Sequence, residues 1–184
     1  MTYEDLKAIL SQHQTIGWDV DATLIRGKNS HLFQQYVVDH PDKNHHIVTF
    51  RTGSLLRRLE IDLSVNKIMP GFNIGLFTGV HGISEAHFEK GFSKTQCVIN
   101  YNDNHENVLL IPPARFQALY KISQEQYAKD HRECFSFKPH TCKAKGMTIL
   151  VDDMVADQRK YCIENNVLLL DSINGHIVNG LLKP

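Results

Sequence analysis

The sequence predicts an α/β fold in which a parallel sheet is covered by helices on both faces, giving three layers. Two observations predict it. Short apolar segments typical of buried strands alternate with helical segments along the chain, and three of these strands end on polar residues. A length of 184 residues and a hydrophobic fraction of 42% are sufficient to build the core of such a domain.

The N-terminal part supplies two strands and three helices. Leu6, Ile9 and Leu10 recur at helical spacing, and the run from Ile16 to Val20 is apolar. Ser30 is a residue type that caps helices, and the apolar segment "HHIVTF" ends in the turn sequence "RTGS". We therefore expect a helix over 3–12, a strand over 16–20, a helix over 30–38, a strand over 45–50 and a helix over 55–63.

The C-terminal part repeats this alternation after a less regular middle region. "QCVINYND" and "NVLLI" resemble strands, and an amphipathic segment opened by prolines predicts a helix over 112–134. The last elements expected are a strand over 147–153, a helix over 155–165 and a strand over 166–172. The middle region is longer than the third strand of the sheet requires. We therefore expect one domain, 1–184, with an insertion or small cap within 66–135.

Charge and cysteine usage limit the classes of partner. Twenty basic and twenty acidic side chains cancel, so no global field attracts nucleic acid, and no apolar stretch approaches the roughly 20 residues that span a bilayer. Four cysteines without paired spacing predict free thiols in a reducing compartment. We expect a cytoplasmic protein without a membrane partner, which binds a small substrate and whose oligomeric state the sequence leaves open.

The polar strand ends are the candidate site. In an open parallel sheet ligands bind beyond the carboxyl ends of the strands, and neighbouring strands lie only about 5 Å apart. Carboxylates gathered there repel one another unless a cation compensates them, and oxygen ligands favour Mg²⁺. Helix capping explains any single one of these residues, but not all three strand ends together. The candidates, strand by strand, are Asp19 and Asp21, Thr49 and Arg51, and Asp152 and Asp153.

Three segments resemble motifs of the haloacid dehalogenase (HAD) superfamily. "DVDATL" is similar to its first motif, "IVTF" to its second and "ILVDDMVAD" to its fourth, and they occur in the order of that family. The resemblance implies a Rossmann-like (HAD-like) three-layer α/β/α sandwich with a modest insertion after the second motif. Ala22 departs from the pattern, since the family often has glycine there. Alanine is expected to be tolerated unless the backbone needs a positive φ.

The resemblance also implies a reaction and a role for each acid. Asp19 would be the nucleophile that forms an aspartyl-phosphate, and Asp21 the general acid and then the base. Thr49 would donate its hydroxyl to a phosphoryl oxygen. Mg²⁺ would be held by the Asp19 carboxylate, the backbone carbonyl of Asp21 and an acid of the fourth motif. The spacing to Asp157 favours Asp153 as that acid, with Asp152 as the alternative. The implied function is hydrolysis of a small phosphomonoester, such as a nucleotide or sugar phosphate.

The active-site lysine of the family has three candidates here, namely Lys138, Lys143 and Lys145. The short run from Lys143 into the acidic pair resembles deoxyribonucleotidase-like members, so Lys143 is favoured. Lys138 resembles the lysine-proline pairing of other branches, but the intervening helix expected there is not evident. Arg51 and Gly53 form a candidate substrate-binding site for an anion.

Two other classes of protein remain as alternatives. A receiver-type phospho-acceptor domain also gathers acids on a parallel sheet, but its acidic pair follows the first strand, whereas here the pair closes a late strand. A binding module without catalysis could retain the same fold.

Overall fold

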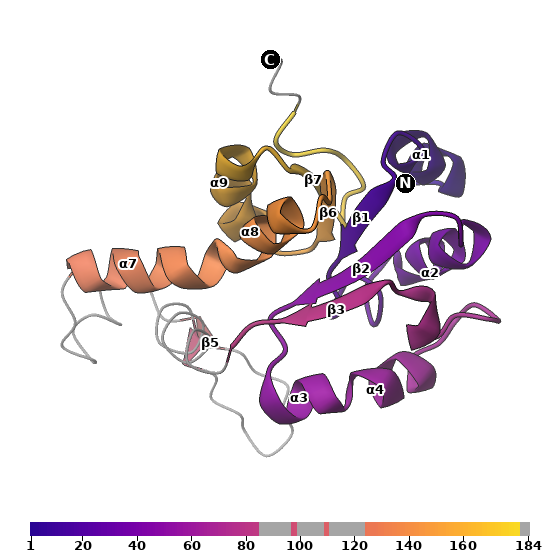
Figure 1. Cartoon of the computed structure of the whole chain (residues 1–184), viewed down its shortest axis with the longest axis horizontal. Coiled ribbons are helices and arrows are strands. Elements are labelled where there is room, and N and C mark those ends of the chain that lie inside the picture. The colour runs from indigo at the N-terminus through magenta and orange to yellow at the C-terminus, as the bar shows by residue number, and fades with distance from the viewer. Residues whose placement is uncertain (85–96, 99–108, 111–123, 181–184) are drawn as a thin grey trace. The chain divides into compact units, whose positions relative to one another are not determined.

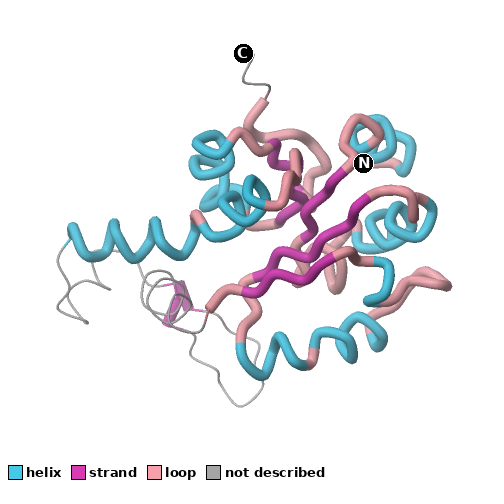
Figure 2. The backbone as a smooth tube through the Cα atoms, in the orientation of Figure 1, coloured by secondary structure: helices cyan, strands magenta, loops and turns pink. Residues whose placement is uncertain are grey.

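A five-stranded parallel sheet lies within the larger of two compact units of the chain (Figures 1 and 2). The computed structural model describes residues 1–84, 97–98, 109–110 and 124–180. The strand order is β3-β2-β1-β6-β7, and every pair of neighbours is parallel. The strands are β1 (Thr15–Trp18), β2 (Asn44–Thr49), β3 (Gly79–Gly82), β6 (Ile149–Asp152) and β7 (Leu168–Asp171).

Helices cover both faces of this sheet. Apolar residues of α1, α2 and α4 join β1, β2, β6 and β7 in one buried cluster, and α8 and α9 lie together on the opposite side (Figure 1). The helices of this part are α1 (Tyr3–Leu10), α2 (Ser30–Asp39), α3 (Gly53–Arg57), α4 (Leu59–Val65), α8 (Phe137–Ala144) and α9 (Val155–Asn165), with a 3-10 turn η1 (Ile74–Leu76). The predicted α/β class, with a parallel sheet between two layers of helices, is therefore confirmed.

The chain divides into two units. One contains residues 1–82 and 138–184, and the other contains residues 83–137. The second unit includes α7 (Gln124–Phe135) and a short antiparallel pair, β4 (Cys97–Val98) and β5 (Leu109–Leu110). These two strands fall inside segments expected to be strands, whereas the first half of the helix expected over 112–134 lies outside the described residues. The cap expected within 66–135 stays a prediction.

Three expectations about single elements were wrong in detail. Ser30 does not cap α2, whose N-cap is Asn29; its hydroxyl instead donates to the carbonyl of Thr23 at 2.6 Å. The helix expected over 55–63 is two short helices, α3 and α4. Helix α8 was not predicted, because proline usually breaks a helix. Pro139 lies in the first turn of α8, where a helix tolerates proline.

A glycine in β1 lets α8 approach the sheet closely. Ile16 and Trp18 of β1 face the core shared with α1 and α2, so Gly17 faces the other side. A Cβ atom on Gly17 would lie 3.0 Å from Sδ of Met147 and 3.1 Å from Sγ of Cys142. The missing side chain thus brings the segment that carries α8 against the central strand.

Three of the four cysteines expected to be free thiols are free. Cys134, Cys142 and Cys162 form no disulfide and are buried. In the described part of the chain, no helix combines the length and the apolar character needed to cross a bilayer.

A buried histidine links β1 and β2 through its side chain. His45 is fully buried, and its Nδ1 accepts a hydrogen bond from the indole N–H of Trp18 at 3.1 Å. Because the indole can only donate, the ring proton of neutral His45 is on Nε2, where it donates to the carbonyl of His40 at 2.9 Å. Burial lowers the pKa of His45 below 6.5. Its neutral form is therefore part of the folded state.

We predict that acid destabilises the protein through His45. With its pKa depressed in the folded state, the histidine contributes stability that is complete above about pH 6.5 and is lost as the pH falls through the folded-state value. The contribution of His45 to the free energy of unfolding should fall between pH 7 and 5, by at most about 1.4 kcal/mol per pH unit. Urea denaturation across this range measures it.

The control for this prediction is His45→Gln, whose amide can accept from Trp18 and donate to His40 without titrating. The variant should show a shallower dependence of stability on pH than the original chain. Parallel curves for the two proteins would contradict the prediction.

Candidate active site

Three carboxylates meet at the carboxyl ends of two neighbouring strands. Asp19 follows β1, Asp152 ends β6 and Asp153 comes next, and one oxygen atom of each lies within 4.8 Å of the others. The pairing of the strands places them there, since Trp18 lies beside Val151 and the backbone N–H of Asp19 donates to the Val151 carbonyl at 2.9 Å. Asp19 and Asp152 are buried and Asp153 is half-buried.

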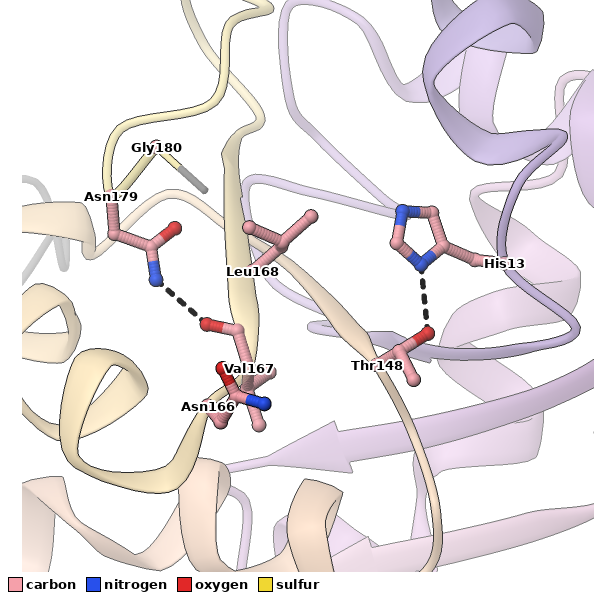
Figure 3. Close-up of a pocket in the computed structure, with 7 residues that line it drawn as sticks. All are labelled: His13, Thr148, Asn166, Val167, Leu168, Asn179 and Gly180. Atoms are coloured by element: carbon pink, nitrogen blue, oxygen red, sulfur yellow. Dashed lines mark hydrogen bonds between the residues drawn. The ribbon is translucent and has the colours of Figure 1, made fainter. Parts of the chain in front are cut away.

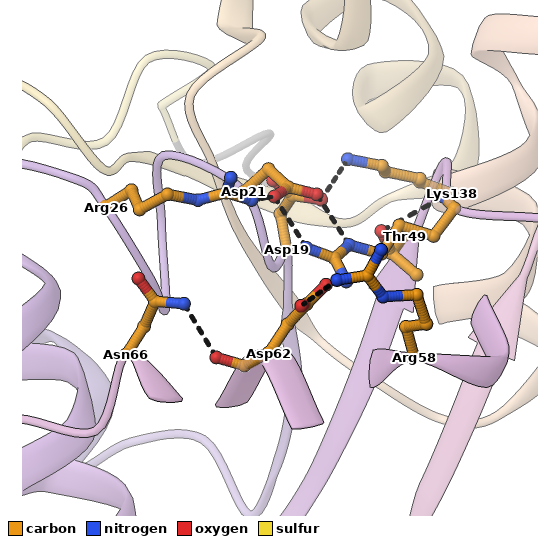
Figure 4. A network of polar contacts seen from close by, with 9 residues as sticks. Asp19, Asp21, Arg26, Thr49, Arg58, Asp62, Asn66 and Lys138 are labelled. Carbon is orange, nitrogen blue, oxygen red and sulfur yellow. Dashed lines mark hydrogen bonds and ion pairs between the residues drawn. The ribbon is translucent and has the colours of Figure 1, made fainter. Parts of the chain in front are cut away.

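A buried lysine joins two of these acids. Figure 4 shows its contact with Asp19. Nζ of Lys138 lies 2.7 Å from Oδ1 of Asp19 and 2.7 Å from Oδ2 of Asp152, and the side chain is 1% exposed. The ammonium also lies 4.3 Å from the centre of the Phe50 ring. The other oxygen of Asp152 accepts the backbone N–H of Met154 at 2.8 Å. Both oxygens of Asp152 are thus engaged in holding the lysine and the following turn.

The sequence favours Lys143 as the lysine of the site, but the lysine that contacts the acids is Lys138. Lys138 is the second residue of α8, and Lys143 lies five residues later, about 140° around the helix, where its side chain is exposed. Lys145 follows the end of α8 and is also exposed. Only one face of α8 is turned toward the acids, so the structure brings Lys138 to the site and leaves the other two candidates outside it.

The inner cluster has an excess of negative charge. Three carboxylates surround one ammonium, which leaves two negative charges uncompensated when all are ionised. Burial raises the pKa of Asp19 against the opposing charge of Lys138, and burial together with Asp152 raises the pKa of Asp153 to about 6. A divalent cation would remove the imbalance, and carboxylate oxygens at this spacing can hold one.

Asp21 points to a second, outer group of charges. Its Oδ2 accepts from Nε of Arg51 at 2.7 Å, and its Oδ1 accepts from Nη2 of Arg51 at 2.8 Å and from Nη2 of Arg26. Nη1 of Arg51 continues to Oδ2 of Asp62 in α4 at 2.5 Å. Burial alone would raise the pKa of Asp21, but the hydrogen bonds and charge of Arg51, with the charge of Arg26, hold it below its usual value.

The residues expected at the end of the second strand lie at the end of β2 and at the start of α3. Thr49 ends β2, is buried, and its hydroxyl oxygen accepts the backbone N–H of Arg51 at 3.2 Å. The Arg51 side chain lies at the site, but its guanidinium group engages two acids. Gly53 begins α3, a helix of five residues, and Asp157 lies in the first turn of α9 outside the three-carboxylate group.

Sequence reasoning missed Asp62. It lies eleven residues after Arg51, in a helix whose sequence gives no short motif that links it to a strand end. Nothing in the sequence around Asp62 indicates that this acid would contact Arg51. A buried glutamine supports this arrangement, since Nε2 of Gln34 donates to the carbonyls of Leu24 and Asn66, at 2.9 and 3.1 Å, and so ties the loop after Asp21 to the end of α4.

A cavity at the other edge of the sheet is separate from these acids. It has a volume of about 240 Å³ and lies beside Thr148 and Leu168, at the amino ends of β6 and β7 (Figure 3). His13 contributes a ring nitrogen 2.7 Å from the Thr148 hydroxyl. The carboxylate cluster lies at the carboxyl ends of the strands and is therefore not part of this cavity.

Comparison of the chain with family models, with curated proteins and with solved structures gives no match in any of the three. The site therefore has to be interpreted from its own geometry.

The loop after β1 contains a strained residue. Ala22 has a φ of 57°, in the left-handed region, so the condition under which alanine would be unfavourable is met. The same turn is crowded, because a Cβ atom on Gly27 would lie 2.1 Å from the Ala22 carbonyl oxygen. The chain therefore tolerates a strained alanine where glycine would relax the backbone.

We predict that Ala22→Gly stabilises the protein by about 1 kcal/mol, because glycine adopts this conformation without a steric penalty. Gly27→Ala, in the same turn, should destabilise it, since the added methyl group meets backbone atoms. Thermal denaturation of the two variants measures both effects. A loss of stability in Ala22→Gly would contradict the assignment of strain.

We predict unequal effects of two lysine substitutions in α8. Lys138→Met removes the partner of two buried carboxylates and should lower the free energy of unfolding by about 3–5 kcal/mol at neutral pH. Lys143→Met removes an exposed charge from the same helix and should change it by less than about 0.5 kcal/mol. Urea denaturation without divalent cations makes the comparison, and equal effects would argue against the assignment of Lys138.

Proposed function

We propose that the protein is a Mg²⁺-dependent phosphomonoester hydrolase that forms an aspartyl-phosphate on Asp19. One observation carries the proposal. Asp19, from the central strand, lies together with Asp152 and Asp153, and Lys138 is hydrogen-bonded between Asp19 and Asp152. The resemblance of the first, second and fourth motifs to the HAD superfamily agrees with it.

The chemistry of the cluster suits a hard divalent cation. Its ligands are all carboxylate oxygens, and its two excess negative charges equal the charge of one such ion. The carboxylates of Asp19 and Asp153 and the backbone carbonyl of Asp21 would hold Mg²⁺, while Asp152 remains engaged with Lys138 and Met154. The bound ion would neutralise charge on the transferring phosphoryl group.

The residues of the chain would carry the reaction in two steps. A carboxylate oxygen of Asp19 attacks phosphorus, the bond to the leaving oxygen breaks, and that oxygen takes a proton from the protonated form of Asp21, whose population Arg51 and Arg26 keep small in the free protein. Water then attacks the aspartyl-phosphate and gives a proton to Asp21, which releases inorganic phosphate and restores Asp19. The ammonium of Lys138 and the hydroxyl of Thr49 stabilise charge on the phosphoryl oxygens.

We predict that the chain hydrolyses p-nitrophenyl phosphate with Mg²⁺ and that chelation by EDTA abolishes this activity. Asp19→Asn removes the nucleophile and should lower kcat by about a thousandfold or more. Asp42→Asn, at an exposed acid before β2, is the matched control and should retain full activity. Release of p-nitrophenolate measures all three.

Turnover that survives in both Asp19→Asn and Asp21→Asn would overturn the mechanism. Transfer of a phosphoryl group from acetyl phosphate to Asp19 without turnover would favour the receiver-type alternative. Absence of both reactions would favour a binding module.

A further inference from the structure

The outer group of charges around Asp21 has an excess of positive charge. Three arginines, Arg26, Arg51 and Arg58, face two carboxylates, those of Asp21 and Asp62. Figure 4 shows Arg26 beside Asp21 and Arg58 beside Asp62. Arg51 is only 5% exposed and is held between both acids, whereas the side chains of Arg26 and Arg58 are 58% and 67% exposed. Arg58 approaches Asp62 only to 4.0 Å. The exposed cations therefore border the site and remain accessible to a dissolved anion.

The backbone holds Arg26 in position at a cost. Its φ is 61°, a left-handed conformation that a non-glycine residue rarely adopts, and it is the second such residue in this loop after Ala22. The loop is closed by a bridge between Asp21 and Ile25 and by the Ile25 N–H, which donates to the Val20 carbonyl at 3.0 Å. Two residues with positive φ in one short loop thus place the guanidinium group of Arg26 beside Asp21.

The position of Asp21 shows which part of a substrate would meet these arginines. In the proposed reaction Asp21 donates a proton to the leaving oxygen, and Asp19 attacks the phosphorus. The guanidinium groups that touch Asp21 therefore border the leaving group and not the phosphoryl group in transfer. Arginine matches carboxylate and phosphate because its N–H groups bind two oxygens of one anion.

We propose, on the basis of the function proposed above, that the substrate is a phosphomonoester whose leaving group carries a second anionic group, a phosphate or a carboxylate, bound by Arg26. Arg58 adds a second exposed cation at the same border. In the structure both oxygens of Asp21 accept hydrogen bonds from arginines. A second anion that takes the N–H groups of Arg26 removes one of the two hydrogen bonds that Oδ1 of Asp21 accepts, while Arg51 continues to hold this oxygen. Such a substrate should therefore bind more tightly and be turned over with a higher kcat/KM.

Matched substrates test the proposal in the full chain with Mg²⁺. We compare phenyl phosphate with 3-carboxyphenyl phosphate, and propyl phosphate with propane-1,3-diyl bisphosphate. The expected result is a kcat/KM at least tenfold higher for the member with the second anion, in at least one pair. An advantage in the phenyl pair indicates that the second anion is a carboxylate, and an advantage in the propyl pair indicates that it is a phosphate. A ratio near one in both pairs would overturn the proposal.

Substitutions then test the residue. In Arg26→Gln the ratio within the favoured pair should fall toward one, and Arg26→Lys, which keeps the charge, should retain part of it. Arg159→Gln removes an exposed arginine from α9 and should leave the ratio unchanged. A ratio that is equal in Arg26→Gln and in the original chain would also overturn the proposal, whatever the loss in overall rate.

A binding measurement separates this inference from the proposed function. Calorimetry compares 4-phosphonobutanoate with butylphosphonate, which cannot be hydrolysed. We expect at least tenfold tighter binding of the first, and loss of that difference in Arg26→Gln. This result without any turnover of phosphate esters would sustain the second anion site and reject the hydrolase. Equal binding of the two phosphonates, with turnover of phenyl phosphate, would reject the site and sustain the hydrolase.

Discussion

The buried ammonium of Lys138 is the interaction on which the rest of the site depends. A lysine taken out of water loses hydration energy that hydrophobic neighbours cannot replace, and here two carboxylates at 2.7 Å compensate it. Those carboxylates come from the ends of two different strands, so the lysine joins β1 and β6 at the point where a parallel sheet exposes its ligands. Removal of the lysine would leave two buried carboxylates without a compensating charge.

The packing of α8 makes this interaction possible. The helix begins one residue before Lys138 and then runs against the face of the sheet where Gly17 has no side chain. A larger residue in β1 would hold Met147 and Cys142 away from the strand and would draw the start of the helix away from the acids. The position of a charge in the site thus depends on a small residue within the sheet.

Two layers of charge of opposite sign surround the position where a substrate would bind. The inner layer, with Asp19 and Lys138, has more negative than positive groups and suits a divalent cation. The outer layer, with Asp21 and Arg51, has more positive than negative groups and suits an anion. Asp21 follows Asp19 by two residues in the sequence but belongs by its contacts to the outer layer, so that it connects the two. An enzyme that transfers a charged group from a charged leaving group would use both layers.

The sequence by itself determined the α/β class and the edge of the sheet where the acids lie. Apolar runs of strand length, separated by helices, predict parallel strands, and the carboxyl ends of parallel strands meet at one edge. Asp19, Asp152 and Asp153 each follow such a run directly, so their convergence could be predicted without knowledge of the packing. The helix over Val155–Asn165 was also predicted with its observed bounds.

Only the tertiary structure decided that Lys138 contacts Asp19 and Asp152, and that Asp62 contacts Arg51. Lys138 and Lys143 lie on the same short helix, and the face that meets the sheet follows from the contacts of Gly17 and not from any local pattern. Asp62 reaches Arg51 because α4 packs its apolar side into the same buried cluster as β1 and β2. Periodicity and capping act over a few residues, whereas the choice between two similar side chains depends on contacts between segments far apart in the chain.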